Sequence, residues 1–233
     1  MKIYQERDVT VIEERGRTIV VSCDSAGAIG SKKHDILQVD PYLVGRITAR
    51  VALMELASVG ATPLVIVDTL CVEMDPTGKR ILEGIKEEAK EIAVITGSTE
   101  ENMKTCQTGV GIMCIGMCDS LRVGKGEQGD LVVAVGIPRV GSDVLGSGEV
   151  IADLQDVETL LSLEYIGAIL PVGSKGIRKE AVCLGPVEFI DSGLDLDGSC
   201  GPSTVVLITI PKERMRDLKN VVKKPITAVA ELL

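Results

Sequence analysis

Hydrophobic positions divide the first half of the chain into alternating strands and helices. Continuous runs of β-branched and other apolar residues predict three strands, at residues 18–23, 64–70 and 110–118. Apolar residues spaced three and four apart predict two helices, at residues 41–60 and 77–95, and Pro41 suits the first position of the first one. The segments between these elements contain glycine, and they are predicted to form a loop at 25–35 and a turn at 96–101.

The second half continues with shorter elements. Strands are predicted at residues 131–135, 187–190 and 203–210, and helices at residues 150–163, 177–184 and 212–222. Glycine and charge cluster at residues 123–129, which favours a boundary between a first domain, 1–126, and a second domain, 127–233. Strands and helices alternate without the glycine fingerprint of a parallel βαβ unit, so the predicted class is α+β in two domains.

Composition narrows the functional classes. The 233 residues include 34 Asp and Glu against 25 Lys and Arg, a formal net charge of −9, and aromatic residues make up 2% of the chain. An acidic chain does not follow a phosphate backbone unless it has a local basic patch, and single-strand binding usually needs several aromatic rings for base stacking. We therefore expect no nucleic-acid partner. The apolar fraction of 45% predicts a folded protein with an aliphatic core.

The sequence gives no indication of export or membrane insertion. Its first eight residues lack the apolar core of a signal peptide, and its longest uncharged apolar run, residues 109–118, is too short to span a bilayer. The seven cysteines are an odd number and form no C-x-x-C pair, which favours buried free thiols in a reducing compartment. We expect a cytoplasmic protein that contacts no membrane.

Two aspartates stand out because of the apolar runs beside them. Asp68 lies inside the run 64–70, where an isolated carboxylate is costly unless it is paired, protonated or metal-bound. Asp24 ends the run 18–23, and a carboxylate at a strand end beside a glycine-rich loop is a common Mg²⁺ ligand. Hydrogen bonds from backbone N–H groups would also satisfy such a carboxylate, so both interpretations stay open at this point.

The loop at 25–35 has the composition of a phosphate-binding segment. Gly27 and Gly30 permit close approach of the backbone, and Lys32 and Lys33 supply positive charge. The loop is not a Walker A loop, because G-x-x-x-x-G-K-[ST] does not occur in the sequence, and a solvated surface turn explains it about as well. His34 is the only histidine of the sequence, which excludes a His-rich zinc site.

Two further segments have the residue types of an anion site. Thr96-Gly97-Ser98-Thr99-Glu100 offers hydroxyls and a carboxylate beside a glycine, and Gly173-Ser174-Lys175-Gly176 precedes a predicted helix. A plain turn or a helix cap accounts for each of them as well.

The motifs occur in a characteristic order. Asp24 and its glycine-rich loop come first, followed by Asp40-Pro41-Tyr42-Leu43-Val44-Gly45-Arg46, residues 52–63, Asp68 in its strand, the segment 96–100, and residues 107–111. This order resembles the N-terminal half of the aminoimidazole ribonucleotide synthetase superfamily, called PurM-like, over about residues 15–140. The superfamily includes thiamine-monophosphate kinase, selenophosphate synthetase and a hydrogenase maturation factor.

The resemblance implies a fold and a set of site residues. The expected fold is a PurM-like two-domain architecture, with an N-terminal mixed sheet and two helices and a shortened C-terminal α/β sandwich. The enzyme would use ATP and Mg²⁺ as a homodimer, with N-terminal strands paired across the dimer. The strand-end metal aspartate of the family corresponds to Asp24 and its second acid to Asp68. Its G-G-[DE]-T turn corresponds to Gly97-Ser98-Thr99-Glu100.

Three departures from the family pattern concern a metal ligand and the choice of substrate. An early G-D-D-A run is missing before Thr18, and an Asn-Asp or Ser-Asp pair in the first helix is replaced by Met54-Glu55. The sequence leaves open whether Glu55 replaces that ligand. The second half has about 105 residues, and Gly173-Ser174-Lys175-Gly176 stands where the family has an acid-and-glycine element. The loop 24–35 and the short length are similar to the α-ribazole kinase branch.

The resulting hypothesis is an ATP-dependent kinase that phosphorylates the 5′-hydroxyl of a small nucleoside, with α-ribazole as the best candidate. Mg²⁺ would be held by Asp24, Asp68 and Glu100, and the nucleotide by Gly27, Gly30, Lys32, Lys33, Gly97, Ser98 and Thr99. Lys32 and Asp35 are the catalytic candidates, with Asp35 as base for the acceptor hydroxyl. The alternatives are a synthetase that activates an amide or acyl oxygen with ATP, and a nucleotide-binding maturation or regulatory protein without turnover.

Overall fold

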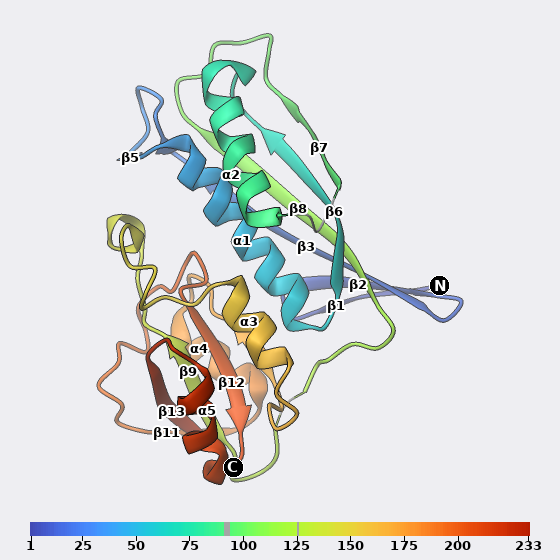
Figure 1. Ribbon diagram of the computed structural model, residues 1–233, viewed down its shortest axis with the longest axis vertical. Helices are drawn as coiled ribbons and strands as arrows, with labels where there is room; N and C mark the ends of the chain where they lie inside the picture. Colours follow the sequence, from blue (N-terminus) through green and yellow to red (C-terminus); the bar gives the residue numbers. More distant parts are fainter. Residues whose placement is uncertain (91–93, 125) are drawn as a thin grey trace. The chain divides into compact units, whose positions relative to one another are not determined.

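The chain folds into two compact units. Figure 1 shows the computed structural model, which describes residues 1–90, 94–124 and 126–233. The first unit is Met1–Leu121 and the second is Arg122–Leu233, a division that falls a few residues before the boundary expected at 126/127. Within the described residues, no helix has the length and apolar character needed to cross a membrane.

A six-stranded mixed sheet forms the first unit, in the order β1-β2-β3-β8-β6-β7. Its strands are β1 (Lys2–Glu6), β2 (Val9–Glu14), β3 (Arg17–Gly27), β6 (Thr62–Leu70), β7 (Val94–Thr99) and β8 (Gly109–Cys118). Neighbouring strands are antiparallel except for β6 and β7, which are parallel. The short strands β4 (Ile29–Gly30) and β5 (Leu37–Gln38) pair with each other in the loop after β3.

Helix α1 (Pro41–Ser58) packs on one face of this sheet, against β3, β8 and β6. Asp40 caps the helix, since its carboxyl accepts a hydrogen bond from the backbone N–H of Tyr42 at 3.0 Å. Ser22 in β3 donates a hydrogen bond to the carbonyl of Ala52 at 2.6 Å. This bond shows that the even-numbered side chains of β3 point toward α1.

Helix α2 (Lys79–Ala89), which follows the helical turn η1 (Met74–Gly78), packs along α1 (Figure 1). The two helices cross with their backbones in direct contact. A Cβ atom at Gly45 would collide with the carbonyl of Ile81, and one at Gly84 would collide with the carbonyl of Tyr42. Glycine at both positions therefore sets how closely the helices approach each other.

A five-stranded antiparallel sheet forms the second unit, in the order β10-β12-β9-β13-β11. Its strands are β9 (Leu131–Gly136), β10 (Ile169–Pro171), β11 (Val187–Phe189), β12 (Val205–Ile210) and β13 (Ile226–Leu232). Its helices are α3 (Leu154–Leu161), α4 (Gly176–Ala181) and α5 (Met215–Val221), with short 3₁₀ turns η2 (Gly141–Val144), η3 (Val182–Leu184) and η4 (Lys212–Arg214). Every residue of β12 is buried, which follows from helices on both faces of the sheet.

The predicted α+β class, the mixed N-terminal sheet with two helices, and the C-terminal sandwich are confirmed. Several bounds were wrong. Strand β3 continues to Gly27, so Asp24 lies inside a strand and not at its end, and Gly27 belongs to the strand and not to the loop. The segment Gly97-Ser98-Thr99, predicted as a turn, lies in strand β7. Hairpin β1–β2 and strand β13 had not been predicted.

The predicted helices are shorter than their patterns suggested. Helix α2 ends at Ala89, whereas the predicted helix ran to residue 95. Residues 91–93 of that prediction lie outside the described residues. The helix predicted at 150–163 is confined to Leu154–Leu161. The segment predicted as the helix 177–184 consists of α4 and η3.

The seven cysteines are all free, but most of them are not buried as predicted. Cys114 and Cys200 are buried and Cys118 is partly buried. Four others are exposed: Cys23, Cys71, Cys106 and Cys183. The cytoplasmic location stays a prediction.

Candidate functional site

Asp24 and Asp68 lie in one row across the sheet of the first unit. Asp24 in β3 pairs with Ile112 in β8, and Ile112 pairs on its other side with Asp68 in β6. Paired residues of neighbouring strands point to the same face, and this is the face that α1 covers, because Ser22 is two residues before Asp24. Two strand spacings separate the backbones of the two aspartates, about 10 Å. The fold thus brings two carboxylates to either side of one buried isoleucine.

Burial controls the protonation of both carboxylates. Burial raises the pKa of Asp24 to about 6, against a smaller opposing effect of a hydrogen bond from the backbone N–H of Ser25. Burial also raises the pKa of Asp68, whose side chain is 3% exposed and accepts a hydrogen bond from its own backbone N–H. Among the described residues, no lysine or arginine forms an ion pair with either carboxylate. A cation bound there would offset the cost of their desolvation.

Gly97 makes room for Asp68. It pairs with Asp68 in the parallel ladder of β6 and β7, and a Cβ atom at position 97 would overlap the carboxyl group of Asp68. The next two residues, Ser98 and Thr99, complete the strand, and the hydroxyl of Thr99 donates to Glu101 at 2.9 Å. The sequence motif thus has a structural role that its prediction as a turn did not suggest.

The loop after β3 is held by Asp35. Its carboxyl accepts hydrogen bonds from the backbone N–H of Lys32 at 2.8 Å and from both the N–H and the hydroxyl of Thr108, each at 2.7 Å. Gly30 lies against this pair, since a Cβ atom there would be 2.9 Å from the Asp35 carboxyl. Gly30 and Asp35 therefore fix the loop. The role of Asp35 as a catalytic base stays a prediction.

Lys32 is bound to a residue that the sequence analysis did not single out. Its ammonium forms an ion pair with the carboxylate of Glu73, which also accepts hydrogen bonds from the N–H and the hydroxyl of Thr105, at 3.0 and 2.8 Å. Chiefly because of Lys32, the pKa of Glu73 is lowered to about 2. Glu73 follows β6 by three residues, and its place after a buried strand was the available signal.

Glu100 does not join the two aspartates. Its carboxyl accepts hydrogen bonds from the backbone N–H groups of Asn102 and Met103, at 2.7 and 3.1 Å, and these bonds lower its pKa. In the described part of the chain, no three acidic, histidine or cysteine side chains come close enough to hold a metal together. The predicted set of three ligands is therefore not assembled in this chain alone. Asp24 and Asp68 are the members that share a face.

The buried carboxylate of Asp68 and the partly buried one of Asp24 nevertheless fit Mg²⁺ bound with a nucleotide. This ion usually takes one or two protein carboxylates and completes its octahedron with waters and substrate phosphates. Asp24 and Asp68 are oxygen ligands of the required type, and their raised pKa values reflect burial without a cationic partner. The donor set therefore suits a site that is completed by the substrate.

The remaining loop residues are solvent-accessible. Lys33 and His34 are exposed, and Gly27 at the end of β3 has open space where a side chain would be. The loop 173–176 of the second unit lies against the segment 196–198, since a Cβ atom at Gly176 would be 2.7–3.0 Å from the carbonyl oxygens of these residues. The anion site predicted at residues 173–176 therefore lies at the start of α4, a helix of only six residues whose first residue is next to another loop.

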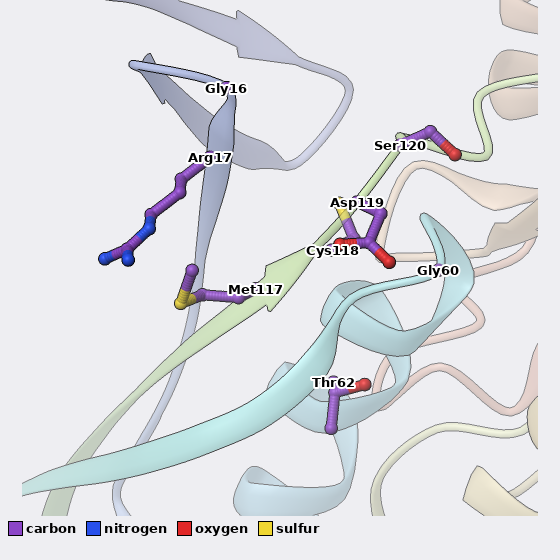
Figure 2. A pocket seen from close by; sticks show the side chains of 8 residues that line it. All are labelled: Gly16, Arg17, Gly60, Thr62, Met117, Cys118, Asp119 and Ser120. Atoms are coloured by element: carbon purple, nitrogen blue, oxygen red, sulfur yellow. The ribbon is translucent and has the colours of Figure 1, made fainter.

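A separate hollow of about 460 Å³ lies at the other end of the same sheet (Figure 2). It is lined by Gly16, Arg17, Gly60, Thr62, Met117, Cys118, Asp119 and Ser120. In Figure 2 the side chain of Arg17 extends away from Asp119. Arg17 lies seven positions before Asp24 on β3, about 23 Å along the strand, so this hollow is distinct from the carboxylate row.

The architecture of the two units is that of the PurM-like fold. Residues 6–118 match the family model of the AIR synthase related protein, N-terminal domain. The first unit therefore matches this family, and the chain as a whole has the PurM-like fold. No curated protein sequence matches the chain.

Solved structures share this fold at low sequence identity. Thiamine monophosphate kinase from Aquifex aeolicus has 14% identity and a TM-score of 0.71, with 97% of this chain and 89% of that chain covered. The hydrogenase maturation protein HypE from E. coli has 14% identity and a TM-score of 0.65, with 91% and 79% covered. PurL from T. maritima, complexed with ADP, has 14% identity and a TM-score of 0.65, with 97% of this chain and 42% of that chain covered.

Proposed function

We propose that this protein is an ATP- and Mg²⁺-dependent phosphotransferase that acts on the 5′-hydroxyl of a small nucleoside, with α-ribazole as the favoured acceptor. The observation that carries the proposal is the row of Asp24, Ile112 and Asp68, with two desolvated carboxylates on one face of the sheet. A thiamine monophosphate kinase of the same fold is known with AMPPCP and TMP bound, and PurL with ADP bound, which supports a nucleotide as substrate.

Phosphoryl transfer needs mainly positioning and charge stabilisation from the protein. Mg²⁺ held by Asp24 and Asp68 would neutralise phosphate oxygens. The loop 28–38 would lie along the phosphates, held in place by Asp35 and Thr108. The bond from the γ-phosphorus to the bridging oxygen of ADP breaks, a bond to the acceptor oxygen forms, and the hydroxyl proton is released.

We assign acceptor binding to the second unit, because its sequence departs most from the family pattern.

We also propose a homodimer. The face of the first sheet opposite α1 carries exposed apolar residues, among them Ile3 at 58%, Met113 at 41% and Val94 at 68% exposure. A second copy of the chain would remove this apolar surface from water. Static light scattering at several concentrations tests the dimer.

Incubation with ATP, Mg²⁺ and α-ribazole tests the reaction directly. We expect equimolar ADP and a nucleoside that has gained one phosphoryl group, detected by mass spectrometry. Asp24→Asn and Asp68→Asn should give neither product. The absence of both products with the unaltered protein would overturn the proposal.

The ADP complex of PurL favours a second candidate, a synthetase that uses ATP to activate an amide or acyl oxygen. Such an enzyme would release ADP with a nucleophile such as ammonia and would not phosphorylate hydroxyl acceptors. ADP assays with matched amide and alcohol acceptors separate the two reactions. A regulatory protein would bind the nucleotide and release no ADP with either.

A further inference from the structure

We propose that the two adjacent lysines of the loop after β3 have different functions. Lys32 is a tether that holds the loop to the residues after β6 through Glu73, and Lys33 is the cation that meets the phosphates of the nucleotide. The assignment of Lys33 rests on the proposed function, whereas the tether does not.

Glu73 receives donors from two loops. The ammonium of Lys32 comes from the loop after β3, and the N–H and hydroxyl of Thr105 come from the loop before β8. The side chains of Lys32 and Glu73 are 15% and 23% exposed. Ion pairs this far removed from water are held more firmly than surface pairs, and the hydrogen bonds of Thr105 fix the carboxylate on its other side.

The same two loops are joined along their length. The N–H of His34 donates to the carbonyl of Cys106 at 2.9 Å, and the side chain of Gln107 donates to the carbonyl of His34 at 2.7 Å. Asp35 then binds Thr108 through both oxygens of its carboxyl. The backbone on both sides of Lys33 is therefore fixed.

Lys33 itself remains available. Its side chain is exposed, and in the described residues no acidic side chain lies within ion-pair distance of it. Moving Lys32 to a phosphate would instead leave the carboxylate of Glu73 unpaired beside another anion, at a cost in both desolvation and repulsion. Lys33 can meet a phosphate without breaking any contact.

A double-mutant cycle in urea tests the tether without nucleotide. Lys32→Met and Glu73→Gln should each lower the unfolding midpoint. The urea midpoint of the double variant should be no lower than that of the less stable single variant, because the double variant leaves no charge without its ion-pair partner. Additive losses would overturn the tether.

Calorimetry with AMPPCP and Mg²⁺ tests the assignment of Lys33. Lys33→Met should weaken binding roughly tenfold with an unchanged unfolding midpoint, and Lys33→Arg should restore it. Lys86→Met, which removes an exposed lysine of α2, is the matched control and should bind as the unaltered protein does. The Lys32→Met/Glu73→Gln variant should also keep its affinity within a few-fold.

Loss of binding in that double variant, with normal binding in Lys33→Met, would overturn the division of roles and make Lys32 the phosphate ligand. If the unaltered protein bound no nucleotide, the proposed function and the role of Lys33 would both fall. The urea cycle would still decide the tether in that case.

Discussion

The carboxyl group of Asp68 occupies the space where any side chain at residue 97 would begin. The two residues are partners in the parallel ladder of β6 and β7, and the Cβ atom of an alanine at 97 would overlap the Asp68 carboxyl. Glycine at this position is therefore a condition for the carboxylate's orientation. The short motif Gly97-Ser98-Thr99-Glu100 contributes to the candidate site because its glycine leaves space for the Asp68 carboxyl.

Gly97→Ala should consequently displace the Asp68 carboxyl. We expect a loss of about 1–3 kcal/mol in the free energy of unfolding, because the strand is overpacked. Mg²⁺-dependent ADP formation should fall by about 100-fold, since a catalytic ligand is moved by about 1 Å. Thr96→Ala, in the same strand with an exposed side chain, is the control. Full activity in Gly97→Ala would remove Asp68 from the metal site.

Asp24→Asn and Asp68→Asn should affect nucleotide binding and stability in opposite directions. Each substitution removes a carboxylate charge that is not compensated by a cation, so the free energy of unfolding should rise by about 1 kcal/mol. Mg²⁺-dependent nucleotide binding should be lost at the same time, as measured by calorimetry. Asp119→Asn, an exposed aspartate at the far end of the sheet, should change neither quantity. Reduced stability with unchanged binding would contradict a metal role.

The tether of Glu73 should depend on pH. The folded protein lowers the pKa of Glu73 from an ordinary 4.5 to about 2, chiefly through Lys32. A lowered carboxyl pKa stabilises the fold above the unfolded pKa, and that contribution is lost as the pH falls from about 4.5 toward about 2. The difference in urea midpoint between the unaltered protein and Glu73→Gln should therefore shrink between about pH 6 and about pH 3. A constant difference would show that the ion pair contributes nothing.

A methyl group added where α1 and α2 cross should destabilise the fold. Gly84→Ala gains up to about 1 kcal/mol of helix propensity but forces the two backbones apart, so we expect a net loss of about 1–2 kcal/mol by urea unfolding. Gly148→Ala is a suitable control, because a Cβ atom there meets open space. Equal stability of the two variants would mean that the helices separate at no cost.

Much of the fold could be predicted from hydrophobic spacing. The run 64–70 and the helical pattern from Pro41 gave β6 and α1 nearly to the residue, because both elements are long and strongly periodic. Strand β3 was cut short at its polar end, since Asp24 and Ser25 do not look like strand residues when their ladder partners in β8 are unknown. Hairpin β1–β2 was missed because its strands, KIYQE and VTVIEE, have charged residues at their ends and leave only short apolar stretches.

The sequence by itself determined that Asp68 is a buried acid in an apolar strand, and the order of its motifs predicted the PurM-like fold. The tertiary structure decided which side chains meet. It placed Asp24 and Asp68 on either side of Ile112, paired Lys32 with Glu73, and turned Glu100 toward its own backbone. Strand register and loop contacts set the first two relations, which join residues 40 or more positions apart and are not encoded by local sequence patterns, whereas the bonds of Glu100 go to the nearby backbone of residues 102 and 103.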